Sequence, residues 1–243
     1  MATSRALTEQ LLSVMDRKHH WAFPRLTQPG LSREALAAHF RHEYRTYVRD
    51  FPVFLARLLG QGPPSDVRAA LAENIFEEQT GKLSLGAPHP ELFLEMMDGL
   101  GIEREAIEGD VAELEPEAIA YRRLLDRRSG EGPWVIGAAV LTIFVEGSVH
   151  ERAELEGARS LLPIEEAIRA HPMVLHYGCP PERMRLVRAH RAVEGGHRRD
   201  AWRIVLAHTG KEIEGAVVGA MEEALGAWQA YRDGVARAMG VVR

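Results

Sequence analysis

The spacing of apolar residues along the chain is helical almost throughout. In segment 32–52 the large apolar side chains recur every three to four residues, which places them on one face of a helix. These residues are Leu36, Phe40, Tyr44, Tyr47 and Phe51. Sustained alternation of polar and apolar residues, which is typical of a half-buried strand, does not occur. The pattern predicts an all-α protein.

Capping residues, prolines and glycines divide this pattern into about seven to nine helices, with Ser32 as the expected cap of the second and Gly81 at the expected end of the third. The expected helices cover about residues 8–20, 32–52, 65–81, 90–100, 116–127, 133–160, 164–170, 181 to beyond 197, and 211–239. Pro52 is expected to kink the second helix, because proline removes an amide donor and clashes with the preceding turn. No linker is long enough to split the chain, so residues 1–243 are predicted to form one domain. In such a helical bundle, cofactor sites are built by side chains on facing helices.

Composition and charge narrow the classes of function. The 243-residue chain is 46% hydrophobic and carries a net charge of −5, with both signs interspersed. It has no basic stripe for a phosphate backbone, so no nucleic-acid partner is expected. The longest apolar run, 134–145, is too short to span a bilayer, so no membrane association is expected. The single cysteine, Cys179, and the lack of an apolar N-terminal leader predict a cytoplasmic protein.

The segment 190–197 holds the most specific pattern of candidate metal ligands. Four steps along a helix bring Glu194 to within about 40° of His190, and seven steps bring His197 to within about 20°. One helix face therefore offers two imidazoles and a carboxylate, a mixture that Fe, Mn, Zn and Co accept. The alternative is a solvated polar face, because four arginines lie in or beside the same segment.

A second group of candidate residues lies where one expected helix ends and the next begins. Glu77 and Glu78 stand near the end of the third helix, and His89 precedes Pro90 at the start of the fourth. Two carboxylates and an imidazole could join a metal site. Solvated acids and a surface histidine are the ordinary interpretation of the same residues.

Glu146 is the third signal, because it follows the apolar run 134–145 directly. A carboxylate in such surroundings is expected to be buried, and buried carboxylates are rare unless they are paired or bind a metal. Pairing with Arg152 is the structural alternative. His150 lies one helical turn after Glu146 and is a substitute candidate ligand.

These signals together resemble the haem-oxygenase-like di-iron oxidases. That family is related in fold to the quinone-cofactor synthase of pyrroloquinoline quinone biosynthesis and to thiaminase-like proteins. The resemblance covers about residues 18–208. Besides the candidate ligands, it rests on segments 31–36 and 44–54 and on Glu-Asn-Ile-Phe-Glu-Glu-Gln-Thr-Gly at 73–81, which is similar to the family's third-helix signature.

The resemblance implies a haem-oxygenase-like bundle that holds two irons per chain, used as Fe(II) and Fe(III), with O2 as co-substrate. The six implied ligands are Glu78, His89, Glu146, His190, Glu194 and His197. Of these, Glu78, Glu146 and His190 are also expected to act in catalysis. Two features depart from the family pattern: the loop before His89 is longer than in some members, and Glu194 stands where many have Asp.

The resemblance leaves the reaction open, because members decarboxylate fatty acids, cleave amino acids, oxidise guanidine or amine nitrogens, or convert one of their own tyrosines to para-aminobenzoate. The last activity is not expected, since Phe23, Val145 and Glu156 occupy the positions aligned with its essential side chains. Three carboxylates at about −3 and two ferrous ions at about +4 leave a centre near +1, which favours a small substrate with a carboxylate.

A substrate pocket is expected from the aromatic stripe of the second helix and from one aromatic residue before it. Its residues are Phe23, Tyr44, Tyr47 and Phe51, and the alternative for them is core packing. An external electron donor, a homodimer, and manganese in place of iron all stay open.

Other functions also stay open at this point. A cofactorless quinone-synthase-like enzyme would need no complete set of iron ligands. A thiaminase-like enzyme would need a nucleophilic cysteine, and the one candidate is Cys179, in an expected loop. A non-catalytic helical binding protein would keep its acids and histidines at the surface, and a haem protein could use His19 or His20.

Overall fold

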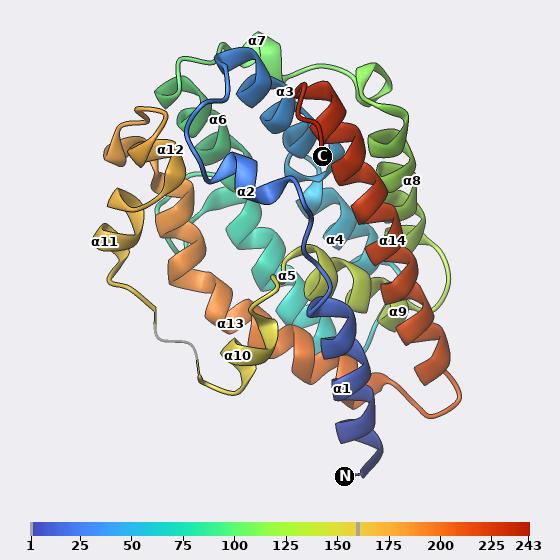
Figure 1. The fold of residues 1–243 in the computed structure, drawn as a ribbon. Coiled ribbons are helices and arrows are strands. Elements are labelled where there is room, and N and C mark those ends of the chain that lie inside the picture. Colours follow the sequence, from blue (N-terminus) through green and yellow to red (C-terminus); the bar gives the residue numbers. More distant parts are fainter. Residues whose placement is uncertain (1, 159–160) are drawn as a thin grey trace.

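The computed structural model describes residues 2–158 and 161–243, except the side chains of 2–4 and 194, and all its regular elements are helical (Figure 1). Eight α-helices have ten or more residues: α1 (Ala2–Met15), α3 (Arg33–Glu43), α4 (Phe51–Gly60), α5 (Ser65–Thr80), α6 (His89–Gly99), α8 (Pro116–Gly130), α13 (Arg185–His208) and α14 (Glu214–Ala238). This confirms the expected all-α bundle.

Shorter helical segments connect the long ones. The short α-helices are α2 (Phe23–Leu26), α7 (Arg104–Ile107), α9 (Trp134–Ala138), α10 (Glu151–Leu155), α11 (Ile164–Arg169) and α12 (Pro172–Leu175). Two segments are π-helical, η1 (Tyr44–Val48) and η3 (Ala139–Val145), and two are 3-10 helices, η2 (Val111–Glu113) and η4 (Pro181–Arg183). In the part of the chain described, every helix is too short or too polar to cross a membrane.

Local sequence explains where the helices near the site begin and end. The Ser32 side chain accepts a hydrogen bond from the amide of Ala35 at 3.1 Å and so caps α3 as predicted. Gly81 ends α5 with a φ of +60°, and a Cβ at this position would overlap the backbone of Ala87. Only glycine fits there, and the tight turn brings the end of α5 close to the start of α6.

Three expected helices differ in the structure. The first begins at Ala2 rather than near residue 8 and ends at Met15. The second is divided into α3, η1 and α4, because Pro52 starts a new helix in its first turn instead of kinking a continuous one. The sixth ends after η3, whereas residues 133–160 were expected to be one helix, and positions 159–160 lie outside the described residues.

The break after η3 has a local cause at Gly147. A Cβ on this residue would overlap the carbonyl oxygen of Ile143 and would lie 2.8 Å from Met15 Cε. The Ile143 carbonyl oxygen therefore leaves no room for a side chain directly after Glu146. The chain leaves the helix at Glu146, and helical structure resumes only at α10.

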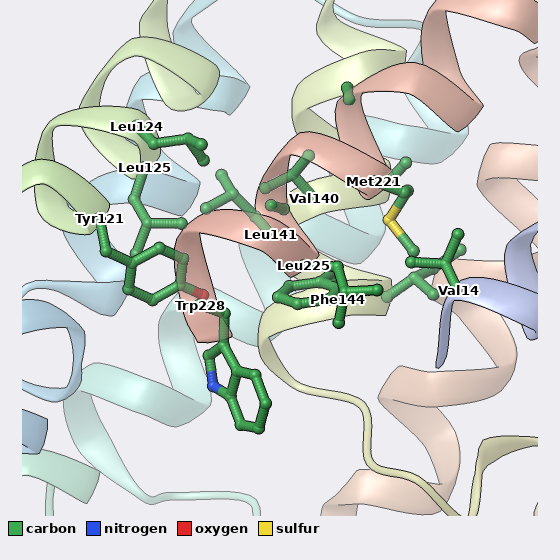
Figure 2. Close-up of a cluster of buried hydrophobic side chains, with 14 of the residues drawn as sticks. Val14, Tyr121, Leu124, Leu125, Val140, Leu141, Phe144, Met221, Leu225 and Trp228 are labelled. Carbon is green, nitrogen blue, oxygen red and sulfur yellow. The ribbon is translucent and has the colours of Figure 1, made fainter. Parts of the chain in front are cut away.

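The larger hydrophobic core lies between α14, α8, η3 and α1 (Figure 2). Side chains such as Tyr121, Leu141, Phe144, Leu225 and Trp228 fill it. A smaller core joins α3, α6 and the beginning of α13. The segments η1, α5, η3 and α13 converge near the boundary of these two cores, and they supply most of the candidate site.

Candidate metal centre

Five of the six expected ligands line one cavity of about 290 Å³. They are Glu78, His89, Glu146, His190 and His197. They come from α5, α6, the end of η3, and two successive turns of α13, so helices far apart in sequence build the cavity together. The backbone of Glu194 belongs to α13, but its side chain lies outside the described residues.

The α5 and α6 side of the cavity is held by a buried carboxylate. Glu77 has no solvent-exposed surface, and it accepts hydrogen bonds from the Ser84 hydroxyl and, at 2.7 Å, from the Leu83 amide. His89 Nε2 lies 3.2 Å from Glu77 Oε1, within hydrogen-bond distance. Glu77 therefore holds the His89 ring in place through its Nε2 atom.

The other nitrogen of His89 faces Glu78. His89 Nδ1 lies 2.9 Å from Glu78 Oε1, yet this buried nitrogen makes no hydrogen bond. A histidine that binds a metal through one nitrogen usually donates its other N–H to a carboxylate or carbonyl group. Glu77 behind the ring and Glu78 in front of it provide this arrangement, so His89 and Glu78 fit as neighbouring ligands of one cation.

Local charges shift the pKa values of these groups in opposite directions. Burial lowers the pKa of His89, but the neighbouring Glu78 and Glu77 carboxylates outweigh it, so the pKa is raised above its usual value. Burial raises the pKa of Glu77, but hydrogen bonds from Ser84, Leu83 and His89 bring it below its usual value. Without a metal, the two carboxylates therefore favour the protonated form of His89.

The α13 side of the cavity offers neutral imidazoles. Burial, followed by repulsion from His89, lowers the pKa of His190 to about 4, and burial likewise lowers the pKa of His197. Both rings are uncharged at neutral pH, as metal binding requires. The His190 and His89 ring centroids lie 5.0 Å apart, so this helix meets the α6 side of the site directly.

Glu146 stands where η3 ends, and a second polar side chain holds it. Asn74 on α5 is 6% exposed and donates from Nδ2 to Glu146 Oε1 at 2.8 Å. Sequence reasoning assigned Asn74 no role, and it indicated Glu77 only as one of two candidate metal-binding carboxylates. One signal was available for Asn74, because it precedes Glu78 by four residues and so lies on the same face of α5.

Two of the four expected pocket residues line this cavity, and two lie elsewhere. Tyr47 and Phe51 line it as expected. Tyr44 instead packs in the smaller core, with its ring centroid 5.5 Å from that of Phe93. Phe23 lies on a second cavity of about 940 Å³ and stacks on Trp228 at 5.8 Å. Tyr44 follows the aromatic pattern but stands at the start of π-helical η1 and packs against α6, whereas Phe23 lies on the separate helix α2.

The larger cavity adjoins the smaller one, since Tyr47 and Val145 line both. His150 lines only this larger cavity and is exposed. The break after η3 removes the helical relation that would have placed His150 beside Glu146. His20 also lines the larger cavity, but its Nε2 lies 3.1 Å from Asp233 Oδ1, and its Nδ1 accepts a hydrogen bond from the Ala22 amide.

The residues of the smaller cavity fit a metal. Neutral imidazoles and carboxylates face one space, and a buried nitrogen of His89 has no hydrogen-bond partner. Within residues 2–158 and 161–243, no three His, Cys, Asp or Glu side chains are already close enough to hold an ion. Binding would therefore require the side chains to draw together around the ion.

Comparison with known proteins places the chain in a family. The family model described as an iron-containing redox enzyme matches residues 37–231. A TenA homolog from Pseudomonas syringae pv. tomato str. DC3000 superposes with a TM-score of 0.71 at 12% identity, over 96% of this chain and 92% of that one. A CADD-like protein of unknown function from Nostoc punctiforme PCC 73102 gives 0.61 at 18% identity, over the whole of both chains.

These two structures share the fold of this chain, and no curated protein matches its sequence significantly. The family match spans η1, α5, α6, η3 and α13, which carry all the candidate ligands. The chain therefore belongs to the haem-oxygenase-like family of iron-containing redox enzymes.

Proposed function

We propose that the chain is an O2-dependent, non-haem di-iron oxidase or oxygenase that acts on a small metabolite with a carboxylate. The observation that carries the proposal is the convergence of five ligand-competent side chains on one cavity. Two ferrous ions bound there would supply electrons to O2 and the oxidising power for the substrate. The protein residues bind the ions, orient the substrate and exclude water.

The positions of the side chains suggest which of the two ions each of them would bind. His190 and His197 come from one helix, so they would bind the same ion together with Glu194. Glu78 and His89 would bind the other ion, with Glu77 fixing the His89 ring. Glu146 would complete the ligand set, because the end of η3 places it in the same cavity and Asn74 holds one of its oxygens.

The wall of the cavity supports a small, partly apolar substrate. Besides the candidate ligands, its lining is Tyr47, Val48, Phe51, Val145, Leu186 and Val193. Apolar side chains keep water away from the reacting centre and strengthen electrostatic interactions inside it. A centre with a net charge of about +1 would attract the carboxylate of an amino acid or a fatty acid. The adjoining larger cavity offers room for the remainder of a longer substrate.

A thiaminase-like activity has little support in this chain. Its single cysteine, Cys179, is 1% exposed and packs in the smaller core beside Met184. Burial raises the pKa of its thiol to about 11, so the nucleophilic thiolate is scarce at neutral pH.

The test is to load the protein anaerobically with Fe(II), add O2 with a panel of amino acids and fatty acids, and follow O2 uptake and products by mass spectrometry. We expect about two irons per chain and substrate-dependent O2 uptake that disappears in H190A. Protein that binds no iron, or that consumes O2 equally in H190A, would overturn the proposal.

A further inference from the structure

The turn that presents Glu146 to the cavity is held by a lysine from outside the expected site. Lys18 lies just after α1, and its ammonium group donates hydrogen bonds to three carbonyl oxygens. These belong to Phe144, to Val145 at 3.2 Å and to Gly147 at 2.6 Å. The three acceptors flank Glu146 on both sides.

Lys18 provides hydrogen-bond partners for the carbonyl groups at the early end of η3. The last carbonyl groups of a helix have no partner within the helix, and a cation near them is favoured by the helix dipole. An ammonium group has three donors, and here three carbonyl oxygens accept them. The Nζ atom also lies 4.8 Å from the centre of the Phe144 ring, at cation–π distance.

Removing the Lys18 ammonium group partly from water costs free energy, so its hydrogen bonds, and not space-filling alone, hold it in this place. Lysine usually keeps its charged end in water while its stem covers apolar surface. Lys18 is half-buried at the wall of the larger cavity, and partial burial, followed by repulsion from Arg232, lowers its pKa to about 7. The three carbonyl hydrogen bonds offset this cost at the one place where η3 stops.

The other side of the same turn is tied to α13. Glu151 is 1% exposed, and it accepts hydrogen bonds from the Trp202 indole at 2.8 Å and from the Ser148 amide at 3.3 Å. Arg198 Nε lies 3.1 Å from the same carboxylate. Arg198 and Trp202 follow His197 on α13. The turn is thus fastened to α1 by Lys18 and to the histidine-bearing helix by Glu151.

We propose that Lys18 is a positioning residue that fixes the turn 144–147, and thereby the Glu146 carboxylate, against the α13 side of the site. Its effect on iron rests on the proposed function, whereas its effect on the turn does not. Two measurements therefore test the effect of Lys18 on the turn and its effect on iron binding separately.

The first readout is hydrogen–deuterium exchange of the metal-free protein. In Lys18→Met, we expect peptides covering 139–151 to exchange at least about tenfold faster, while peptides from α8 keep their rate. Lys211→Met, which removes an exposed lysine, is the matched control and should behave as the wild type. Unchanged exchange at 139–151, or equal acceleration in every helix, would overturn the proposal.

The second readout is anaerobic Fe(II) binding. Loss of a residue that orients a ligand costs about 10- to 100-fold in metal affinity, and we expect that loss in Lys18→Met but not in Lys211→Met. Gly147→Ala, which displaces the same turn with Lys18 intact, should reproduce both effects and replaces Lys18→Met if that variant does not fold. Normal iron affinity in a variant with a loosened turn would refute the role of Lys18 in positioning Glu146. If the wild type bound no iron, the proposed function would fail, and the exchange experiment would still decide whether Lys18 holds the turn.

Discussion

The two sides of the candidate centre are held in different ways. On α5 and α6, Glu77, Glu78 and His89 contact one another, and Glu77 is tied to the backbone of the following loop. On α13, the ligand segment contains Gly195 and Gly196, although the helix is continuous from Arg185 to His208. Among the described atoms, nothing lies within 4 Å of a Cβ built on Gly196.

The glycines of α13 therefore relieve no contact among the described residues, and each lowers the intrinsic stability of the helix by about 1 kcal/mol relative to alanine. Hydrogen bonds to Glu77 hold the α5 and α6 side in place without a metal. If the proposed centre binds iron, the α13 side would depend more on neighbouring helices and on the bound ion. The following predictions test this difference.

The largest effect is expected on α13. His190→Ala or His197→Ala should remove one of the two irons and all O2 uptake, because each takes a nitrogen ligand from a site with open positions. His150→Ala should leave both properties intact, since His150 lines only the larger cavity. Iron content and an oxygen electrode measure both. Iron lost in His150→Ala but kept in His89→Ala would show that the assignment of His89 is wrong.

On the other side, Glu77→Gln should weaken metal binding without removing a ligand. The amide keeps the size of the side chain but loses the charge behind His89, and such changes cost about 10- to 100-fold in affinity. Glu105→Gln, the same change at an exposed position on α7, is the control and should bind as the wild type. Anaerobic titration with Co(II) measures the difference, and equal affinities for the two variants would contradict the role given to Glu77.

Metal affinity should depend on pH through His89. In the metal-free protein its pKa is raised, because the stabilisation by Glu78 and Glu77 outweighs the effect of burial. Protonated His89 thus stabilises the metal-free fold at low pH, and this contribution is lost as pH rises through the raised pKa. Metal binding must displace that proton, so affinity should rise about tenfold per pH unit below the pKa and then level off.

A Co(II) titration series between about pH 5.5 and 8 would show this rise. The pKa values of His190 and His197 are lowered, so they contribute little in that range. Glu77→Gln should move the midpoint to lower pH, and an affinity independent of pH would exclude a His89 imidazolium in the metal-free site.

The smallest effect is expected from Gly196→Ala. Because space is open around its Cβ, alanine should raise the unfolding free energy of the metal-free protein by about 0.5–1 kcal/mol. Gly226→Ala in α14, also without described neighbours within 4 Å of its Cβ, is the matched control. Urea denaturation measures both. Destabilisation by Gly196→Ala alone would mean that the glycine has a packing role.

Sequence reasoning succeeded where one local feature decides the outcome. The Ser32 cap, the turn at Gly81 and the spacing of His190 and His197 each depend on a few neighbouring residues, and the structure agrees with all three. All six ligand candidates were named from such motifs, whereas the meeting of five of them in one cavity was expected from the family resemblance rather than from spacing.

The rest depended on contacts between distant segments. The turn at Glu146 is held by Lys18 from just after α1, and neither segment alone predicts this contact. Glu77 was named as part of a motif, but only the fold shows that it lies behind the His89 ring. Tyr44 carries the right spacing for a pocket, yet the packing of α6 places it in a core.

The most direct test of the account is an anomalous diffraction map, recorded at the iron edge from crystals grown anaerobically with Fe(II). We expect two peaks about 4 Å apart in the cavity lined by Glu78, His89, Glu146, His190 and His197. No peak in that cavity, or iron bound only in the larger cavity beside His20 and His150, would contradict it.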